Sequence, residues 1–232
     1  MRLDKLLANK AFGSRKEVHQ IIKDRRVTVN DIIVVKKDHP INIDTDTIAV
    51  DGSQISTKQL YYIKFHKPAG YITAVEDRSH PVVMDLLPPE FKKMGVFPVG
   101  RLDKDTEGLL LLTNDGVWAH SIINGHKHVP KVYYVEFHGI LSKEGLERIS
   151  VGIGLGDGIQ CKPATINILS DKSLEITLEE GKYHQVKRMI GAAGGEVTYL
   201  KRLSVGHITL SGIEETNTYL EIGDQEIADF KK

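Results

Sequence analysis

The chain has 232 residues, of which 41% are hydrophobic and 27% are charged, a composition typical of a folded protein in water. Its length allows one large domain, or a small domain and a larger one. No apolar run approaches the ~18 residues that span a bilayer, and the charged start "MRLDKLLANK" lacks the apolar core of a signal peptide. These features argue against a membrane protein. The single cysteine, Cys161, cannot form an internal disulfide, so we expect a reducing, cytoplasmic location.

Charge is unevenly distributed, although 31 basic and 31 acidic residues give a formal net charge of zero. Residues 1–40 hold ten basic and five acidic residues, a net of +5, and residues 181–202 hold five and one, a net of +4. Residues 211–232 hold six acids and two lysines, a net of −4. Local potential rather than total charge attracts polyanions, so the two basic segments are candidate binding surfaces.

The first fifty residues have the pattern of a small helix-and-hairpin unit. Leu3, Leu6 and Leu7 lie at helical spacing, and Ser14 with Glu17 has the spacing of a capping box that begins a second helix. The run "RRVTVNDIIVV" predicts two short strands joined at Asn30-Asp31, because both residues tolerate positive φ. A further short strand is expected in the polar stretch that follows.

This unit resembles the S4 (αL-type) RNA-binding domain in "RLDKLLA", "SRKEVHQII" and "RRVTVND", with Asp31 where glycine is usual. On charge alone, its basic residues would be a solvated helix face; the resemblance implies instead that they face RNA phosphates. The residues concerned are Arg15, Lys16, Lys23, Arg25 and Arg26. We place the first domain at residues 1–58 and a second domain at residues 59–232.

The second domain alternates short β-like runs with a few helices. Strands are predicted at 61–65, 70–75, 109–113, 132–137, 164–169, 173–179 and 207–210, and helices at 117–123, 142–149 and 183–194. Many strands with few crossover helices predict an α+β fold on a mostly antiparallel mixed sheet flanked by helices.

The segment "GRLDKDTEGLLLLTNDG", residues 100–116, places charges directly before a buried strand. In an extended backbone Arg101 and Asp103 lie on one side, and Leu102 points to the core. A carboxylate beside a cation and apolar residues suits a nucleophile or base, although the segment alone favours a structural ion pair at the start of a strand. A calcium loop starting at Asp103 fails, because its ninth and twelfth positions are Leu111 and Asn114.

The same segment resembles the signature of the ribosomal RNA pseudouridine synthases that include the RsuA, RluB, RluE and RluF types, G-R-L-D-x-x-T-x-G-L-L-L-L-T-x-D-G. Three further motifs of that family appear in order along the chain: "HKPAGY" from His66, where asparagine is usual, "KVYYVE" from Lys131, and "EGKYHQVKRM" from Glu180. With the S4 pattern in front, the resemblance covers nearly the whole chain. It implies an isomerase, an intramolecular transferase, that needs no cofactor and no metal.

The resemblance also implies roles for individual residues. Asp103 is implied as the catalytic residue, which either attacks C1′ of the ribose or removes the C2′ proton. Tyr133, by itself an ordinary strand tyrosine, would stack on a flipped-out uracil, and Lys187 would pair with Asp103. Arg101 would replace the flipped base or hold its phosphate, and Lys182 and Arg188 would contact phosphates from a basic helix face.

The expected substrate is a uridine of 16S (small-subunit) rRNA, since the N-terminal S4 unit and the acidic C-terminal segment favour that type. A 23S (large-subunit) target and a non-catalytic S4-type ribosome-assembly factor are the alternatives. We expect rRNA in an assembling ribosomal subunit as the partner, and a monomer. The pair of histidines in "GHKH", residues 125–128, has no metal-ligand partners at suitable spacing.

Overall fold

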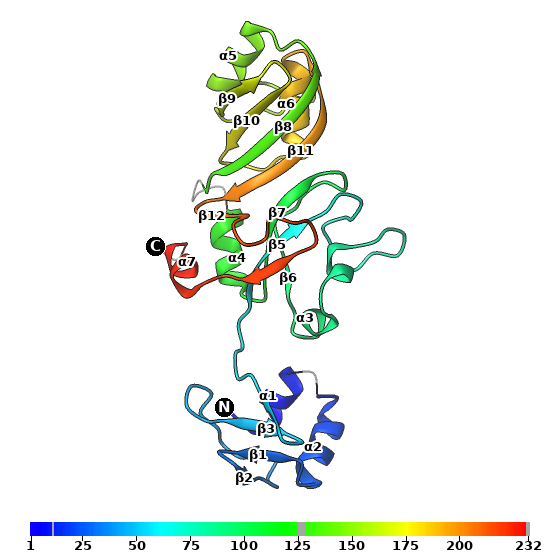
Figure 1. The fold of residues 1–232 in the computed structure, drawn as a ribbon, viewed down its shortest axis with the longest axis vertical. Helices are drawn as coiled ribbons and strands as arrows, with labels where there is room; N and C mark the ends of the chain where they lie inside the picture. Colours follow the sequence, from blue (N-terminus) through cyan, green and yellow to red (C-terminus); the bar gives the residue numbers. More distant parts are fainter. Residues whose placement is uncertain (11, 125–128, 231–232) are drawn as a thin grey trace. The chain divides into compact units, whose positions relative to one another are not determined.

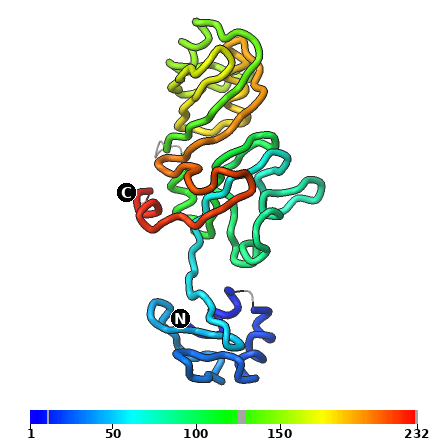
Figure 2. The backbone as a smooth tube through the Cα atoms, in the orientation of Figure 1, coloured from blue at the N-terminus to red at the C-terminus, as the bar shows by residue number. Residues whose placement is uncertain are grey.

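A computed structural model describes residues 1–10, 12–124 and 129–230. The chain divides into two compact units, one of residues 1–61 and 87–96 and one of residues 62–86 and 97–232. Each unit is described by itself (Figures 1 and 2). The "GHKH" segment lies outside the described residues. We propose that the boundary between the two domains lies between residues 58 and 59.

The first unit packs two helices on a small antiparallel sheet, as the sequence predicted. Its elements are α1 (Leu3–Asn9), α2 (Arg15–Lys23), β1 (Val27–Val29), β2 (Ile32–Ile33), β3 (Ile48–Val50) and β4 (Ser53–Ile55), with strand order β2-β1-β3-β4. The Ser14–Glu17 capping box is present, and Asn30 and Asp31 turn the first hairpin with φ of 51° and 64°. The short α3 (Pro89–Lys93) also belongs to this unit.

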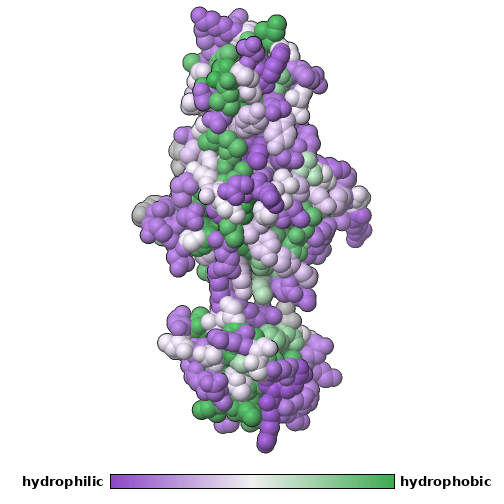
Figure 3. Space-filling view, viewed as in Figure 1, coloured by the Kyte–Doolittle hydropathy of each residue, from purple (hydrophilic) through white to green (hydrophobic). Residues whose placement is uncertain are grey.

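The core of the first unit comes from the helix faces that the leucine and isoleucine spacing predicted. Leu3, Leu6, Leu7, Val18 and Ile22 are all fully buried in one cluster. The opposite face of α2 carries the basic residues, and the surface over α2 in Figure 3 is accordingly hydrophilic. Burial therefore separates an apolar inner face from a cationic outer face.

The second unit is built on a nine-stranded mixed sheet with the order β13-β5-β7-β11-β8-β10-β9, and with β6 and β12 pairing β7 and β11. Its strands are β5 (Tyr62–Lys67), β6 (Phe97–Val99), β7 (Glu107–Thr113), β8 (Lys131–Gly139), β9 (Thr165–Ser170), β10 (Ser173–Leu178), β11 (Gly195–Val205), β12 (Ile208–Thr209) and β13 (Tyr219–Glu221). Its helices are η1 (Val83–Leu86), α4 (Gly116–Ile123), α5 (Lys143–Val151), α6 (Gln185–Ala192) and α7 (Asp224–Asp229). Figure 1 shows α5 and α6 beside the β8–β11 half of the sheet and α4 near β6.

The mostly antiparallel α+β architecture is confirmed, with one parallel pairing among the described strands, that of β7 with β11. At this pairing Gly108 has a φ of 107°, and a Cβ there would lie 2.2 Å from the carbonyl oxygen of Arg202. Only glycine lets the two backbones approach so closely. This approach brings the start of β7, just after Asp103, next to β11.

One predicted strand was wrong and one long strand was missed. Residues 70–75 form bends and a single bridge from Ile72 to Val82. Thr73 is held there by its side chain, which donates to the carbonyl of Leu102 (2.8 Å) and accepts from its amide (3.1 Å). The eleven-residue β11 follows α6 within three residues, and its charged and polar positions obscured its period-two pattern.

No helix of the described chain is both long and apolar enough to cross a membrane.

Candidate active site

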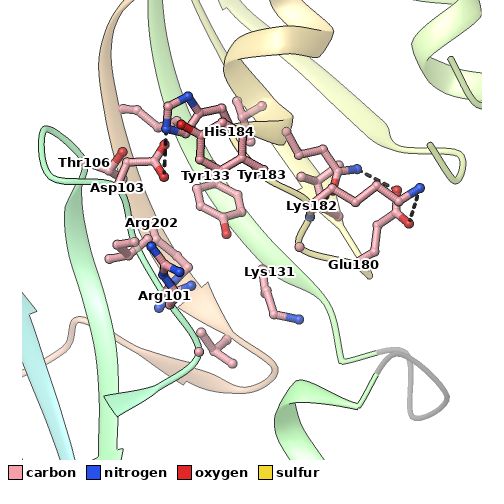
Figure 4. A pocket seen from close by; sticks show the side chains of 18 of the residues that line it. Arg101, Asp103, Thr106, Lys131, Tyr133, Glu180, Lys182, Tyr183, His184 and Arg202 are labelled. Atoms are coloured by element: carbon pink, nitrogen blue, oxygen red, sulfur yellow. Dashed lines mark hydrogen bonds and ion pairs between the residues drawn. The ribbon is translucent and has the colours of Figure 1, made fainter. Parts of the chain in front are cut away.

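A cavity of about 380 Å³ opens in the second unit where the 99–106 segment meets β8, the residues before α6, and β11. Its lining includes Arg101, Asp103, Lys131, Tyr133, Lys182, His184 and Arg202 (Figure 4). Segments that are far apart in the sequence therefore meet in one hollow. Arg101, Asp103, Tyr133 and Lys182 are predicted site residues that line it, whereas Lys187 and Arg188 are not among its lining residues.

The Asp103 carboxylate lies in this cavity and is accessible, with 29% of its side chain exposed. The Lys187 Nζ is 3.5 Å from Oδ2, and the His184 Nε2 is 3.6 Å from Oδ1. Both side chains come from the α6 region, 81 to 84 residues further along the chain. No ion pair joins Arg101 to Asp103, both of which the structure describes, so the expected Arg101 pairing is wrong. The extended segment instead places Arg101 in the wall of the cavity.

Lys187 forms ion pairs with two aspartates, and Asp105 is closer to it than Asp103. Its Nζ donates to Asp105 Oδ1 at 2.6 Å, compared with 3.5 Å to Asp103. Burial tends to raise the pKa of Asp105, but the hydrogen bond and charge of Lys187 outweigh it and hold that pKa below its ordinary value. The lysine therefore contacts both carboxylates of the "DKD" turn.

Sequence reasoning missed His184. This residue precedes α6 in the left-handed conformation, with a φ of 48°, and its ring stacks on Tyr183 with centroids 3.9 Å apart. Positive φ is uncommon for residues other than glycine, although histidine adopts it more often than most, and such conformations concentrate at functional sites. The "KYHQVK" motif contained the residue, but only the fold shows that its ring reaches Asp103.

A buried lysine fixes the loop that carries Asp103. Lys67, at the end of β5, is fully buried, and its Nζ donates to the carbonyls of Pro68 (3.0 Å), Lys104 (3.3 Å) and Thr106 (2.8 Å). Burial lowers the pKa of Lys67 to about 8. The amide of Thr106 also donates to the Asp103 carbonyl at 3.1 Å, closing the turn. The side chain of Lys67 therefore anchors the loop that follows Asp103 to the end of β5.

The unusual His66 of the "HKPAGY" motif is fully buried on β5. Its Nδ1 lies 2.9 Å from the carbonyl of Ile213, and it is registered opposite Leu109 on β7. It therefore lies within the sheet beneath the cavity rather than in the cavity lining.

Tyr133 lies on β8 between Ile176 of β10 and Arg202 of β11. Only 8% of it is exposed, and its ring projects into the cavity (Figure 4). An aromatic ring that projects into a cavity is suited to stacking against a base.

The remaining predicted RNA-binding residues occupy different surroundings. Lys182 is paired with Glu180 at 3.3 Å and precedes α6, so the expectation that it lies on the helix face was wrong. Arg188, on α6, pairs with Asp157 at 2.5 Å. In the first unit Arg15, Lys16, Lys23 and Arg25 are exposed, whereas Arg26 donates to both oxygens of Asp51, at 2.7 and 2.5 Å.

Within the part of the chain that the structure describes, no cluster of three or more histidine, cysteine, aspartate or glutamate residues could hold a metal ion. The thiol of Cys161 is buried, and burial raises its pKa.

Comparison with known proteins identifies the class to which this fold and site belong. The family model for RNA pseudouridylate synthase matches residues 61–192, and the S4 domain model matches residues 1–45. The chain is 41% identical to the uncharacterized RNA pseudouridine synthase YtzG of Bacillus subtilis strain 168, covering 98% of this chain and 97% of that protein.

Other relatives are similar over the full length. Ribosomal small subunit pseudouridine synthase A of Vibrio cholerae is 36% identical over 100% of both chains, and that of Escherichia coli K12 is 34% identical over 98% and 99%. A crystal structure of a pseudouridylate synthase superimposes with a TM-score of 0.69 at 31% identity, covering 99% of each chain.

An S4 domain followed by this sheet and cavity defines an RNA-modifying enzyme. The chain belongs to the RNA pseudouridylate synthase family, and it is an RNA pseudouridine synthase whose substrate is RNA.

Proposed function

We propose that this enzyme converts a specific uridine of 16S rRNA into pseudouridine, and that Asp103 is the catalytic residue acting on a flipped-out nucleotide. The 16S assignment is supported by the full-length similarity to proteins named ribosomal small subunit pseudouridine synthase A. The role of Asp103 is supported by one observation above all: its accessible carboxylate shares a cavity with Tyr133 and lies within 3.6 Å of the Lys187 ammonium and the His184 ring.

The reaction is an isomerisation in which no atoms are gained or lost. The N1–C1′ bond of the uridine breaks, the uracil turns, and its C5 bonds to C1′; the C5 proton is then lost and N1 gains one. Asp103 either attacks C1′ and is later displaced by C5, or removes the C2′ proton and later returns it. Both routes begin with the carboxylate anion, which Lys187 and His184 favour when they carry positive charge.

Other cavity residues position the nucleotide. Extruding a nucleotide from folded RNA costs a few kcal/mol, and stacking of the uracil on Tyr133 offsets part of that cost. Arg101 takes the place vacated by the base or contacts its phosphate. Lys182 and Arg188 bind phosphates after exchanging their acidic partners, Glu180 and Asp157, for RNA.

The first unit supplies sequence-independent affinity for the RNA. Its exposed Arg15, Lys16, Lys23 and Arg25, together with Arg26, contact phosphates and bring the second unit to its target. The proposal includes a monomeric enzyme acting on rRNA in an assembling small subunit.

The test is replacement of Asp103 in the cell followed by mapping of pseudouridines in 16S and 23S rRNA. We expect the Asp103→Asn protein to fold with an unchanged Tm, and the strain to lose one 16S pseudouridine completely. Asp105→Asn is the matched control, because it changes a neighbouring acid of the same turn that is exposed outside the cavity lining. Persistence of the modification with Asp103→Asn would exclude the catalytic role, and loss at a 23S position would move the target to the large subunit.

A further inference from the structure

The cavity contains positive charge that the described chain does not neutralise. Asp103 has Lys187 and His184 beside it, and Glu180 is engaged by Lys182 and by the Gln185 amide. Arg101, Lys131 and Arg202 form no ion pair with any acidic side chain that the structure describes. In Figure 4 these three lie toward the lower side of the view, and Asp103 and His184 lie toward its upper side.

Arg202 is the most unusual member of the group, because only 3% of it is exposed. Its Nε donates to the carbonyl of Leu109 at 2.7 Å, but its buried Nη2 has no hydrogen-bond partner. A buried guanidinium normally satisfies its donors, since leaving one unpaired costs free energy. The fold nonetheless fixes Arg202 here, because Gly108 lets β7 approach the backbone of Arg202 closely.

Lys131, on β8, is a second cation that lines the cavity together with Arg202. Its Nζ donates only to the carbonyl of Val129, at 2.9 Å, among the described groups. Burial, and then the charge of Arg202, lower the pKa of Lys131 to about 8, with a smaller opposing effect from Glu179. Two cations that destabilise each other are an arrangement that a bound anion would stabilise.

We propose that Arg202 and Lys131 form a subsite for the phosphate group of the target nucleotide. Lys131 and Tyr133 are two residues apart on β8 and lie on the same side of that strand, and Arg202 is registered opposite Tyr133. A nucleotide with its base on Tyr133 and its ribose at Asp103 then directs its phosphate to Arg202 and Lys131. Guanidinium and ammonium groups are the usual protein ligands of phosphate. This inference rests on the proposed placement of the nucleotide in the cavity.

The test compares binding of uridine 5′-monophosphate and uridine to the full-length protein by isothermal titration calorimetry, which does not depend on which rRNA is modified. We expect the phosphate to strengthen binding by on the order of tenfold, the effect of a charge-assisted hydrogen bond. Asp103→Asn keeps this preference, so a failure of the catalytic proposal leaves the subsite testable.

Lys131→Met is the primary variant, because Lys131 is only partly buried and we expect its replacement to leave the sheet intact. It should abolish most of the preference for the monophosphate, and Arg202→Lys should reduce it if circular dichroism shows a folded protein. Lys143→Met removes an exposed cation on α5 and should retain the preference. Equal binding of the two ligands, no detectable binding of the monophosphate, or an unchanged preference in Lys131→Met would each overturn the proposal.

Discussion

The cavity has two different charge environments, one at Asp103 and one at Lys131 and Arg202, with Tyr133 close to both. Asp103 lies beside Lys187 and His184, whereas Lys131 and Arg202 form no ion pair with a described carboxylate. Tyr133 lies on β8 close to both groups. A nucleotide has a planar base and an anionic phosphate that are both attached to the ribose. In the proposed binding mode Tyr133 contacts the base, Asp103 contacts the ribose, and Lys131 and Arg202 contact the phosphate.

The lowered pKa of Lys131 predicts a pH dependence for phosphate binding. In the free protein the pKa is about 8 rather than 10.5, and an adjacent phosphate favours the charged amine and raises the pKa again. Arg202 opposes the charge on Lys131 and Glu179 favours it. Binding at a pH between about 8 and 10 is therefore coupled to proton uptake, and affinity falls as the pH rises through about 8.

Calorimetry of uridine 5′-monophosphate binding in two buffers of different ionisation enthalpy measures that proton uptake. The wild-type protein should take up a fraction of a proton at pH about 8.5. Lys131→Met should show none and should lose the fall in affinity. Binding to the wild-type protein that is independent of pH from about 7 to about 9.5 would contradict the assignment.

At the scale of elements, the sequence predicted those parts of the fold that depend on local patterns. The α2 capping box, the Asn30-Asp31 hairpin and the leucine-rich β7 were correct, because cap, turn and strand signals lie within a few residues. The α6 motif likewise indicated a helix carrying Lys187.

Features that depend on contacts between distant elements were not predictable. The approach of β7 to β11 at Gly108 has no local signal in either segment, and neither does the pairing of β8 with β11 that places Arg202 beside Tyr133. His184 reaches Asp103 through a left-handed backbone that a histidine rarely adopts. The expected Arg101–Asp103 pairing was wrong for a related reason. Closeness in the sequence does not show which cation pairs with Asp103, and the cation that does so is Lys187, from a distant part of the chain.

The contact between β5 and the catalytic loop gives a prediction at this scale. Lys67→Met leaves three carbonyls without their donor, two of them in the loop that follows Asp103. We expect a loss of stability of about 2–3 kcal/mol and a fall in kcat larger than any change in KM, because the loop no longer holds Asp103 in place. Thermal unfolding and steady-state kinetics on transcribed 16S rRNA measure the two effects.

Lys64→Met is the matched control, since Lys64 is also buried on β5 but donates to the carbonyl of Ser211, away from the loop. It should lower the Tm while leaving kcat within a few-fold of the wild type. Equal effects of the two substitutions on kcat would show that Lys67 acts on stability alone.

At the scale of the whole molecule, the net charge is zero, but positive charge is concentrated at two places, the cavity of the second unit and the surface of the first unit. In the proposed function the cavity binds one nucleotide, whereas the exposed cations of the first unit suit binding to any RNA phosphate. Arg15 and Lys16 lie in the first turn of α2, where the helix dipole disfavours positive charge by about 0.3–1 kcal/mol. A face that served only for solubility would have no need of cations at that position.

This predicts opposite effects on stability and on RNA binding. The double substitution Arg15→Gln and Lys16→Gln should leave the Tm unchanged or slightly higher, because it removes charges that oppose the dipole. It should also weaken binding to transcribed 16S rRNA and reduce the slope of log affinity against log salt by about 1–2, since each phosphate contact contributes about 0.7–0.9. Arg26→Gln should change the slope less, because Asp51 already compensates that guanidinium with two hydrogen bonds. Filter binding over a range of salt concentrations measures these slopes, and an unchanged slope in the double variant would show that the first turn of α2 does not contact RNA.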